Sequence, residues 1–388
     1  MKFSVERTQM ADAVRKAIKV VPKITTDPFL EGLLVEVNAD RGIISITGTD
    51  LNIQIQCRIK NAHIEEDGEF VMPVVVLNML NLMTGDTVLF ESSPLYKNSV
   101  QISSGNTVYD IPVMTAEDYP KIKIPYPKEY VCIGGISEVI KNTAFAAETG
   151  NESSPMQYIK LNFTPMGVTA EAMNNQYGAF AKSKRSADSN LSLIIHQKAL
   201  GILSGLISQK DTVYVGVNGK SVVFIKEDLV FHTRIHNGEY RESSQLMDRI
   251  VPQYKAMANA AELLNLAENT SSILSPGDDQ GINMSFTADK IVLQTVTATG
   301  KSKGAIEATD VIVTPDSGFF YQVKALIDCI RHTSGNVNLI LDKQGFLMLS
   351  AGENKYFLAP RRPIQIAIKA KGEKKTKTVK SKSTKKAA

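Results

Sequence analysis

The chain has 388 residues, more than one hydrophobic core usually spans, so its length predicts two or three domains. With 43% hydrophobic and 22% charged residues, it has the composition of a folded globular protein and not of a disordered or fibrous one. The formal charge of +4 is unevenly distributed. Residues 369–388 hold nine Lys and one Glu, so residues 1–368 carry a charge of −4. The basic character therefore belongs to a short terminal segment.

The N-terminal segment and the cysteines exclude several classes of protein. Residues 1–7 become charged too early for a secretory signal, and no apolar run approaches the ~20 residues of a membrane helix. We expect a soluble, intracellular chain. Cys57, Cys132 and Cys329 lie far apart without paired spacing, so neither a disulfide framework nor a zinc site is indicated. We expect them to act as small core residues.

The first 125 residues predict two helices and a meander of strands. Residues 51–60 alternate strictly between apolar and polar, which is typical of a half-buried antiparallel strand. Met10, Val14 and Ile18 form an i, i+4, i+8 stripe, which predicts an amphipathic opening helix. The other predicted elements of this segment are strands at 33–37, 42–49, 69–73, 99–102 and 107–111, and an apolar helix at 74–83.

The same order of elements recurs twice, at a spacing of about 125 residues. The apolar helix at 74–83 reappears at 197–208 and at 322–333, each time followed by a strand. Opening helices are predicted at 136–148 and 256–268. We therefore predict an α+β fold of three tandem domains, each with two helices and about eight strands, at residues 1–125, 126–250 and 251–368.

The sequence indicates no motif for catalysis, nucleotide binding or metal binding. Gly219-Lys220-Ser221 resembles the end of a phosphate-binding loop, but its flanks alternate as a strand and the first glycine of that motif is missing. His232 and His236 have the spacing of a helical metal pair, yet they lie in an alternating run, where both rings would share a solvent face. We expect no catalysis, no metal and no cofactor, and favour a binding or structural protein.

Several stretches carry a family resemblance that extends to about residue 363. They are Met1–Arg7, residues 33–51, Asp118-Tyr119-Pro120, Ile273-Leu274-Ser275, residues 326–330 and Pro360-Arg361. In this order and spacing, on a threefold repeat, the chain resembles the bacterial type of DNA polymerase sliding clamp, the beta subunit of DNA polymerase III, as a divergent member. The resemblance implies a ring-shaped head-to-tail homodimer of six clamp domains, with helices lining the hole and sheets outside.

The resemblance also implies a function. A sliding clamp is a processivity factor that encircles double-stranded DNA without sequence specificity and tethers the replicative DNA polymerase, with the clamp loader and other clamp-binding proteins as further partners. Weak positive charge inside the ring suits sliding, because each neutralised phosphate steepens the salt dependence of binding. The alternative for the helix cations is an ordinary solvated face. The predicted DNA-facing residues are Arg15, Lys16, Lys19, Lys23, Lys141, Lys198, Lys324 and Arg331.

Two further sites follow from the resemblance. The dimer interface would bring Tyr109 and Ile111 of one subunit against Ile273 and Leu274 of the other, unless these four are ordinary core residues. A pocket between the second and third domains would bind short peptide motifs of partner proteins. The chain departs from the family at residues 173–178, so we expect a generic pentapeptide motif to bind weakly without cognate flanks. The predicted pocket residues are Ile159, Gly178, Leu246, Phe357 and Pro360.

Two other functional classes stay open on the sequence. One is an enzyme whose site is assembled from distant residues, and the other is a β-rich structural assembly protein. A dimer of about 85 kDa, twice the 42.5 kDa chain, would favour the clamp. We expect a cytoplasmic, nucleoid-associated protein, or one in the host cytoplasm if a virus encodes it. Residues 369–388 are predicted to be a disordered Lys-rich tail, either for solubility or as an auxiliary DNA arm.

Overall fold

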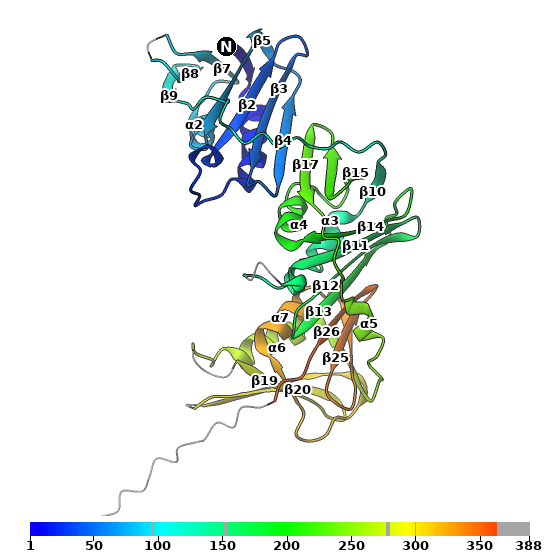
Figure 1. Cartoon of the computed structure of the whole chain (residues 1–388). Coiled ribbons are helices and arrows are strands. Elements are labelled where there is room, and N and C mark those ends of the chain that lie inside the picture. The colour runs from blue at the N-terminus through cyan, green and yellow to red at the C-terminus, as the bar shows by residue number, and fades with distance from the viewer. Residues whose placement is uncertain (95, 151–153, 277–279, 299, 363–388) are drawn as a thin grey trace, which may run out of the picture.

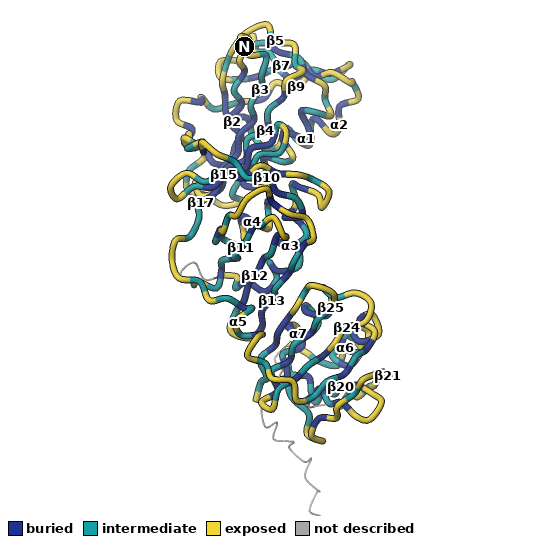
Figure 2. The backbone as a smooth tube through the Cα atoms, turned by 90° about the vertical axis from the view of Figure 1, so that its right-hand side faces the viewer, coloured by how far each residue is buried: buried dark blue, intermediate teal, exposed yellow. Residues whose placement is uncertain are grey.

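The computed structural model describes residues 1–94, 96–150, 154–276, 280–298 and 300–362. These residues form three lobes along an open arc, with the N-terminus in the lobe at one end and the third copy of the repeat at the other (Figures 1 and 2). The predicted Lys-rich tail lies outside the described residues. None of the described helices is long and apolar enough to cross a bilayer.

The first copy of the repeat contains two α-helices and nine strands. Its elements are β1 (Lys2–Glu6), α1 (Arg7–Ala17), β2 (Gly32–Asn38), β3 (Ile43–Thr49), β4 (Gln54–Ile59), β5 (His63–Glu66), β6 (Gly68–Pro73), α2 (Val76–Leu82), β7 (Thr87–Ser92), β8 (Ser99–Ser104) and β9 (Thr107–Pro112).

The second copy repeats this order with eight strands and adds a short helix, α5, after its last strand. Its elements are β10 (Val131–Gly134), α3 (Ile136–Lys141), β11 (Tyr158–Thr164), β12 (Gly167–Met173), β13 (Tyr177–Ser183), β14 (Leu191–His196), α4 (Gln197–Ser204), β15 (Thr212–Asn218), β16 (Ser221–Lys226), β17 (Leu229–Arg234) and α5 (Ser243–Met247).

The third copy again has two helices and nine strands. Its elements are β18 (Tyr254–Asn259), α6 (Ala260–Ser271), β19 (Gly281–Phe286), β20 (Lys290–Val296), β21 (Lys301–Glu307), β22 (Thr309–Ile312), β23 (Phe319–Gln322), α7 (Val323–Arg331), β24 (Asn336–Leu341), β25 (Leu347–Ala351) and β26 (Asn354–Leu358). The α+β architecture with two main helices per copy is as predicted.

The three copies are joined by continuous sheets. An eight-stranded sheet runs β10-β15-β16-β17-β4-β3-β2-β6, so that β17 of the second copy pairs with β4 of the first. A nine-stranded sheet joins the second and third copies in the same way, through β26 and β13. A five-stranded sheet ending at β9 and a four-stranded sheet ending at β21 remain at the two ends of the arc.

Helices and strands occupy different sides of the arc. In Figure 1, α2, α4 and α7 lie on its inner side, and β10, β14 and β25 lie on its outer side. Each helix packs an apolar stripe against the sheets, on the face that points away from the inside of the arc. Met10 and Val14 of α1 are examples, and both are fully buried. We propose domain boundaries near residues 125 and 250, since both positions lie in connections between named elements.

Three predicted boundaries are wrong. The helix predicted at 136–148 ends at Lys141, and the other two differ for local reasons. The strand predicted from residue 51 begins at Gln54, because Leu51 adopts a left-handed backbone (φ 72°) in a turn that Asp50 holds by accepting from the Asn52 and Ile53 amides. The helix predicted from residue 256 begins four residues later. Residues 254–259 form β18, and the Asn259 side chain caps α6 by accepting from the Ala261 and Glu262 amides.

The three cysteines are free thiols, as the spacing indicated. Cys57 and Cys329 are buried, whereas Cys132 is half-buried. Burial raises the pKa of the Cys57 thiol to about 12, which keeps it protonated and unreactive at neutral pH. Two of the three therefore fill core space as predicted.

The expectation of a shared solvent face for His232 and His236 is wrong. His232 is 3% exposed and lies opposite Gln54 in the pairing between β17 and β4, and both its ring nitrogens lack a hydrogen-bond partner among the described residues. His236 instead stacks on Tyr158, with ring centroids 4.4 Å apart. Burial, and next the charge of Arg234, lower the pKa of His232.

A lowered pKa in the fold makes protonation of His232 favour the unfolded chain. Stability is complete above the ordinary histidine pKa of about 6.5 and falls as the pH drops toward the lower folded-state value. We predict that, when the pH is lowered from about 7.5 to about 5.5, the melting temperature of His232→Gln falls less than that of the wild type. Calorimetry of both proteins checks this.

The exposed His63 provides the matched control. His63→Gln should keep the wild-type pH dependence of the melting temperature. Equal pH dependence of the wild type and His232→Gln would contradict the account of the buried ring.

Candidate DNA-facing surface, sheet edges and partner pocket

Three of the predicted DNA-facing cations are engaged with acids on their own helix or its neighbour. Arg15 and Lys16 of α1 both face Asp12, at 3.7 and 2.6 Å. Arg331 at the end of α7 contacts Glu268 of α6 at 2.7 Å. Such exposed pairs contribute little stability, but they offset the local positive charge. These three side chains therefore add little net charge to the helical surface.

Two more of these cations tie the first copy to the second. Lys19 Nζ donates to the Gly205 carbonyl at the end of α4, at 2.9 Å. In the opposite direction, Lys198 Nζ of α4 lies 2.7 Å from Asp50 Oδ2, a carboxylate that is 10% exposed. Lys19 belongs to the turn after α1 and Asp50 follows β3, so both contacts link the first copy to α4 of the second.

Lys23, Lys141 and Lys324 are exposed and form no ion pair within the described parts of the chain. They come from different copies: Lys23 follows α1, Lys141 ends α3 and Lys324 lies in the first turn of α7. Helix α2 carries no basic residue. The helical side thus offers a few separate cations and not a dense basic patch.

The predicted interface residues differ in how deeply they are packed. Ile111 of β9 is 5% exposed and belongs to the main core, whereas Tyr109 is half-buried against it. Leu274, just beyond α6, also packs against that core. Its neighbour Ile273 is half-buried and is absent from the core contacts of the described residues. Within one chain, Tyr109 and Ile111 lie at one end of the arc, and Ile273 and Leu274 lie at the other.

A cavity of about 540 Å³ lies where the second copy meets the third. Two of the predicted pocket residues, Leu246 and Phe357, line it. Ile159 is fully buried in the main core and Pro360 is not part of the lining. The lining residues are Leu246, Arg249, Ile250, Val251, Gln253, Asp342, Lys343, Gln344, Phe346 and Phe357.

Gly178 does not line the cavity, but it lies directly behind Phe357, which does. It pairs with Phe357 across the β13–β26 seam. A Cβ atom at this position would lie 2.3 Å from Phe357 Cε1, so only glycine allows the ring to lie against the strand. The ring of Phe357 can therefore form the floor of the cavity.

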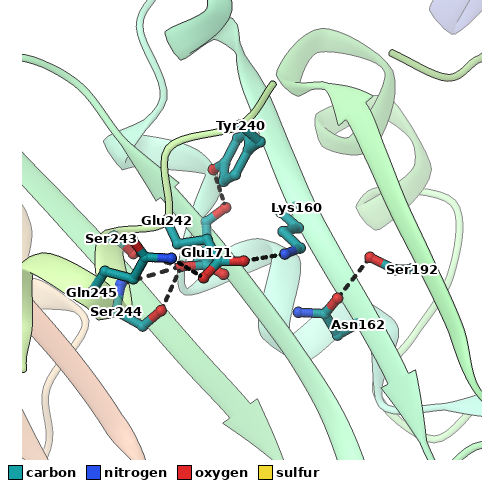
Figure 3. A network of polar contacts seen from close by, with 9 residues as sticks. All are labelled: Lys160, Asn162, Glu171, Ser192, Tyr240, Glu242, Ser243, Ser244 and Gln245. Carbon is teal, nitrogen blue, oxygen red and sulfur yellow. Dashed lines mark hydrogen bonds and ion pairs between the residues drawn. The ribbon is translucent and has the colours of Figure 1, made fainter. Parts of the chain in front are cut away.

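A buried carboxylate fixes the α5 wall of the cavity (Figure 3). Glu171 of β12 is 3% exposed, and its Oε2 accepts from the amide and the hydroxyl of Ser244 at 3.2 and 3.1 Å. Ser243 Oγ lies 3.3 Å from the same oxygen, and the Tyr240 hydroxyl donates to the Glu171 carbonyl at 2.7 Å. We call Glu171, Tyr240, Ser243 and Ser244 the Glu171 clasp.

A second contact holds the same segment. Lys160 of β11 forms an ion pair with Glu242, which also accepts from Gln245. The hydrogen bond from Lys160 lowers the pKa of Glu242, so the pair stays charged at neutral pH. The segment that leads to Leu246 is thus anchored to the sheet at the start of α5.

Sequence reasoning missed Glu171 and the polar rim of the cavity. Glu171 interrupts the small apolar run of residues 170–173, and a lone acid at a buried strand position was the available signal. Arg249 and Lys343 had no such signal, since both lie in irregular segments. Among the described residues, no group of three or more His, Cys, Asp or Glu side chains could hold a metal ion.

Comparison with known proteins agrees with this geometry. Residues 1–123 match the family model of the DNA polymerase III beta subunit, N-terminal domain. The beta sliding clamp of Bacillus subtilis (strain 168) is 23% identical over 303 residues, which are 74% of this chain and 78% of the relative. That of Pseudomonas putida is 22% identical over 319 residues, covering 76% of this chain and 80% of the relative.

Solved structures extend the likeness to all three copies of the repeat. A DNA polymerase sliding clamp from Bacillus subtilis superposes with a TM-score of 0.83 at 20% identity, covering 94% of this chain and all of the other. The DNA polymerase III beta subunit of Thermotoga maritima gives a TM-score of 0.83 at 18% identity with the same coverage. Over most of its length this chain is therefore similar to bacterial sliding clamps and has their fold, and its residues 1–123 match the N-terminal domain of the DNA polymerase III beta subunit.

Proposed function

We propose that two copies of this chain close head to tail into a ring that encircles duplex DNA and tethers a replicative DNA polymerase, without catalysis of its own. The observation that carries the proposal is the pair of open sheet edges at the ends of an arc that otherwise consists of continuous sheets. The family likeness supports the same function. Replication partners such as a clamp loader, and a cytoplasmic location, belong to this proposal.

The two internal seams predict how the ring closes. Gln54 lies opposite His232 in one seam, and Gly178 lies opposite Phe357 in the other. On their other side, Gln54 and Gly178 each pair with the last residue of the strand before their own. Lys301 of β21 is the equivalent residue in the third copy, since it pairs with Val296, the last residue of β20. His232 and Phe357 are the fourth residues of β17 and β26, and the fourth residue of β9 is Asp110.

In both seams, the fourth residue of one strand lies opposite Gln54 or its equivalent. The same register between subunits places Asp110 opposite Lys301 of the partner subunit, and Tyr109 opposite its Ser302. An acid and a base directly across a strand pair attract each other. Ser302 pairs with Thr295, whose hydroxyl donates to the Thr270 carbonyl of α6, so this face of β21 looks toward the end of that helix. Tyr109 would then approach Ile273, which agrees with the interface expected from the resemblance.

The distribution of cations suits a ring that slides. Lys23, Lys141 and Lys324 are the members of the predicted DNA-facing set that stay exposed and unpaired within the described residues. Scattered single charges attract phosphates without fixing a register, and few simultaneous contacts keep the salt dependence shallow. Retention on DNA then depends on topology. Of the remaining five cations, Lys19 and Lys198 link the first two copies, and Arg15, Lys16 and Arg331 are paired with acids.

The cavity between the second and third copies is the proposed site for partner segments. Its floor and walls carry the apolar side chains of Leu246, Phe346 and Phe357, and its volume is in the range of ligand pockets. A short apolar segment of a polymerase or loader could bury its side chains there. We infer that Ile159 and Pro360 do not contact the bound segment and affect its binding only by supporting the residues around the cavity.

Retention on circular DNA tests the proposed function. The full chain, loaded by a clamp loader onto a nicked circular plasmid, should stay bound through gel filtration at high salt, and cutting the plasmid should release it. A ring slides off free ends, whereas a protein held by phosphate contacts dissociates with salt on either DNA form. Salt-dependent loss from the intact circle, or retention on the linear product, would contradict the clamp.

The Glu171 clasp predicts a coupling between a buried acid and partner binding. Glu171→Gln keeps the size of the side chain but sets an amide against the hydroxyl and amide donors of Ser244. We expect the free energy of unfolding to fall by about 1–3 kcal/mol. We also expect the affinity for a short fluorescent peptide with leucine and phenylalanine anchors to fall at least about threefold, as measured by anisotropy well below the melting temperature.

Ser192→Ala is the matched control, because it removes the nearby hydrogen bond from Ser192 to Asn162 without touching α5 (Figure 3). Its peptide affinity should equal that of the wild type. If Glu171→Gln is destabilised yet binds the peptide normally, the clasp stabilises the fold without positioning the pocket.

A further inference from the structure

The cavity between the second and third copies, here called the partner pocket, has an apolar surface that extends from its floor to its solvent-exposed edge, the lip. Phe357 is 4% exposed and forms a small core cluster with Met173 and Met247, against which Leu246 and Ile250 pack. Val251 follows directly and is 72% exposed. Apolar surface therefore extends from the buried floor outward to solvent, where a bound segment can cover it.

Two cations stand beside this apolar surface on different walls. Arg249 belongs to the segment after α5, and Lys343 lies in the turn between β24 and β25. Both side chains are exposed, and neither forms an ion pair within the parts of the chain that are described. Their charges are thus available to a ligand at the rim.

The one acid of the lining is held within its own turn. Asp342 Oδ1 accepts from the amides of Gln344 and Phe346, at 2.8 and 2.9 Å. Its backbone carbonyl accepts from the Gly345 amide at 3.2 Å. This turn fixes the backbone on both sides of Lys343. With two cations and one acid, the lining carries one net positive charge.

The wall that carries Arg249 is fixed as well. The Glu171 clasp holds the start of α5, and the Arg249 and Ile250 amides donate to Leu246 and Met247 at 3.2 and 3.1 Å. Backbone that is ordered before binding reduces the entropy that binding must overcome. Both cations therefore project from ordered backbone on either side of an apolar floor.

We propose that the protein segment bound in this pocket carries acidic residues next to its apolar anchors. The inference rests on the proposed function of the pocket and specifies the chemistry of its ligand. The anchors bury their side chains against Phe346 and Phe357, while glutamate or aspartate on either side meets Arg249 and Lys343. This pairing explains why a bare apolar motif, without flanks, would bind weakly to this chain.

The experiment uses the full chain and three short fluorescent peptides with the same leucine and phenylalanine anchors. Their flanks carry glutamates, glutamines or lysines. We expect the glutamate peptide to bind roughly fivefold tighter than the glutamine peptide at low salt, as two rim pairs would give, and the lysine peptide to bind most weakly. The differences should shrink as salt screens the charges.

Charge reversal tests whether the two named cations are responsible. Arg249→Glu with Lys343→Glu should invert the order, so that the lysine peptide binds best. Lys128→Glu with Lys220→Glu makes the same change in net charge at exposed positions outside the lining, and should keep the wild-type order. Equal affinities of the wild type for all three peptides, or an order that survives the reversal, would overturn the proposal.

A separate variant distinguishes this proposal from the pocket itself. Val251→Ser removes apolar surface at an exposed lip position and should weaken all three peptides by a similar factor. If no peptide binds, or if Val251→Ser changes nothing, the pocket is not the partner site and both proposals fail. If Val251→Ser weakens binding while the flanks have no effect, only the acidic preference fails.

Discussion

Unpaired strand edges are the constraint on which the rest of this structure depends. A strand at the edge of a sheet exposes a row of backbone donors and acceptors that must be paired, covered or hydrated. The chain meets this requirement between its copies by joining β17 to β4 and β26 to β13, so that each seam lies inside a sheet. β9 and β21, the counterparts of the seam strands at the two ends of the arc, have no such partner within the described part of one chain.

The seams also organise the other features of the molecule. His232 is buried because it lies in the strand pair of the first seam, and Phe357 reaches the pocket floor because Gly178 allows close approach in the second. Lys19 and Lys198 link the first two copies on the helical side of this seam. Cations that appear in sequence as DNA contacts thus serve partly to hold the arc in shape. The weak remaining charge suits a protein that moves along DNA.

Much of the fold could be predicted from the sequence, because alternation and repetition are local signals that survive in tertiary structure. The three copies, each with two main helices, are examples. Boundaries failed where a single polar side chain decided the backbone, as Asp50 does before β4 and Asn259 does before α6. His232 was misjudged because alternation marks two faces of a strand, yet a strand at a seam can be buried on both.

The candidate sites were less predictable. Leu246 and Phe357 meet in the pocket, but Ile159 is in the core, since family position alone does not specify depth. Glu171 acts through contacts with a segment about seventy residues away, a distance that no periodicity encodes. The proposed pairing of Asp110 with Lys301 of the partner subunit could be derived only from the register of the internal seams.

The most direct test of the account is a cysteine cross-link across the proposed seam between subunits. Directly opposite residues in an antiparallel pair have Cα atoms about 4.5–5.5 Å apart, within the reach of a disulfide. With Cys132 changed to Ser, oxidised Asp110→Cys/Lys301→Cys should give a dimer that is covalently closed at both seams. Asp110→Cys/Ser302→Cys, one residue out of register, should not. Efficient cross-linking of the second variant, or monomers from both, would contradict a ring closed by β9 and β21.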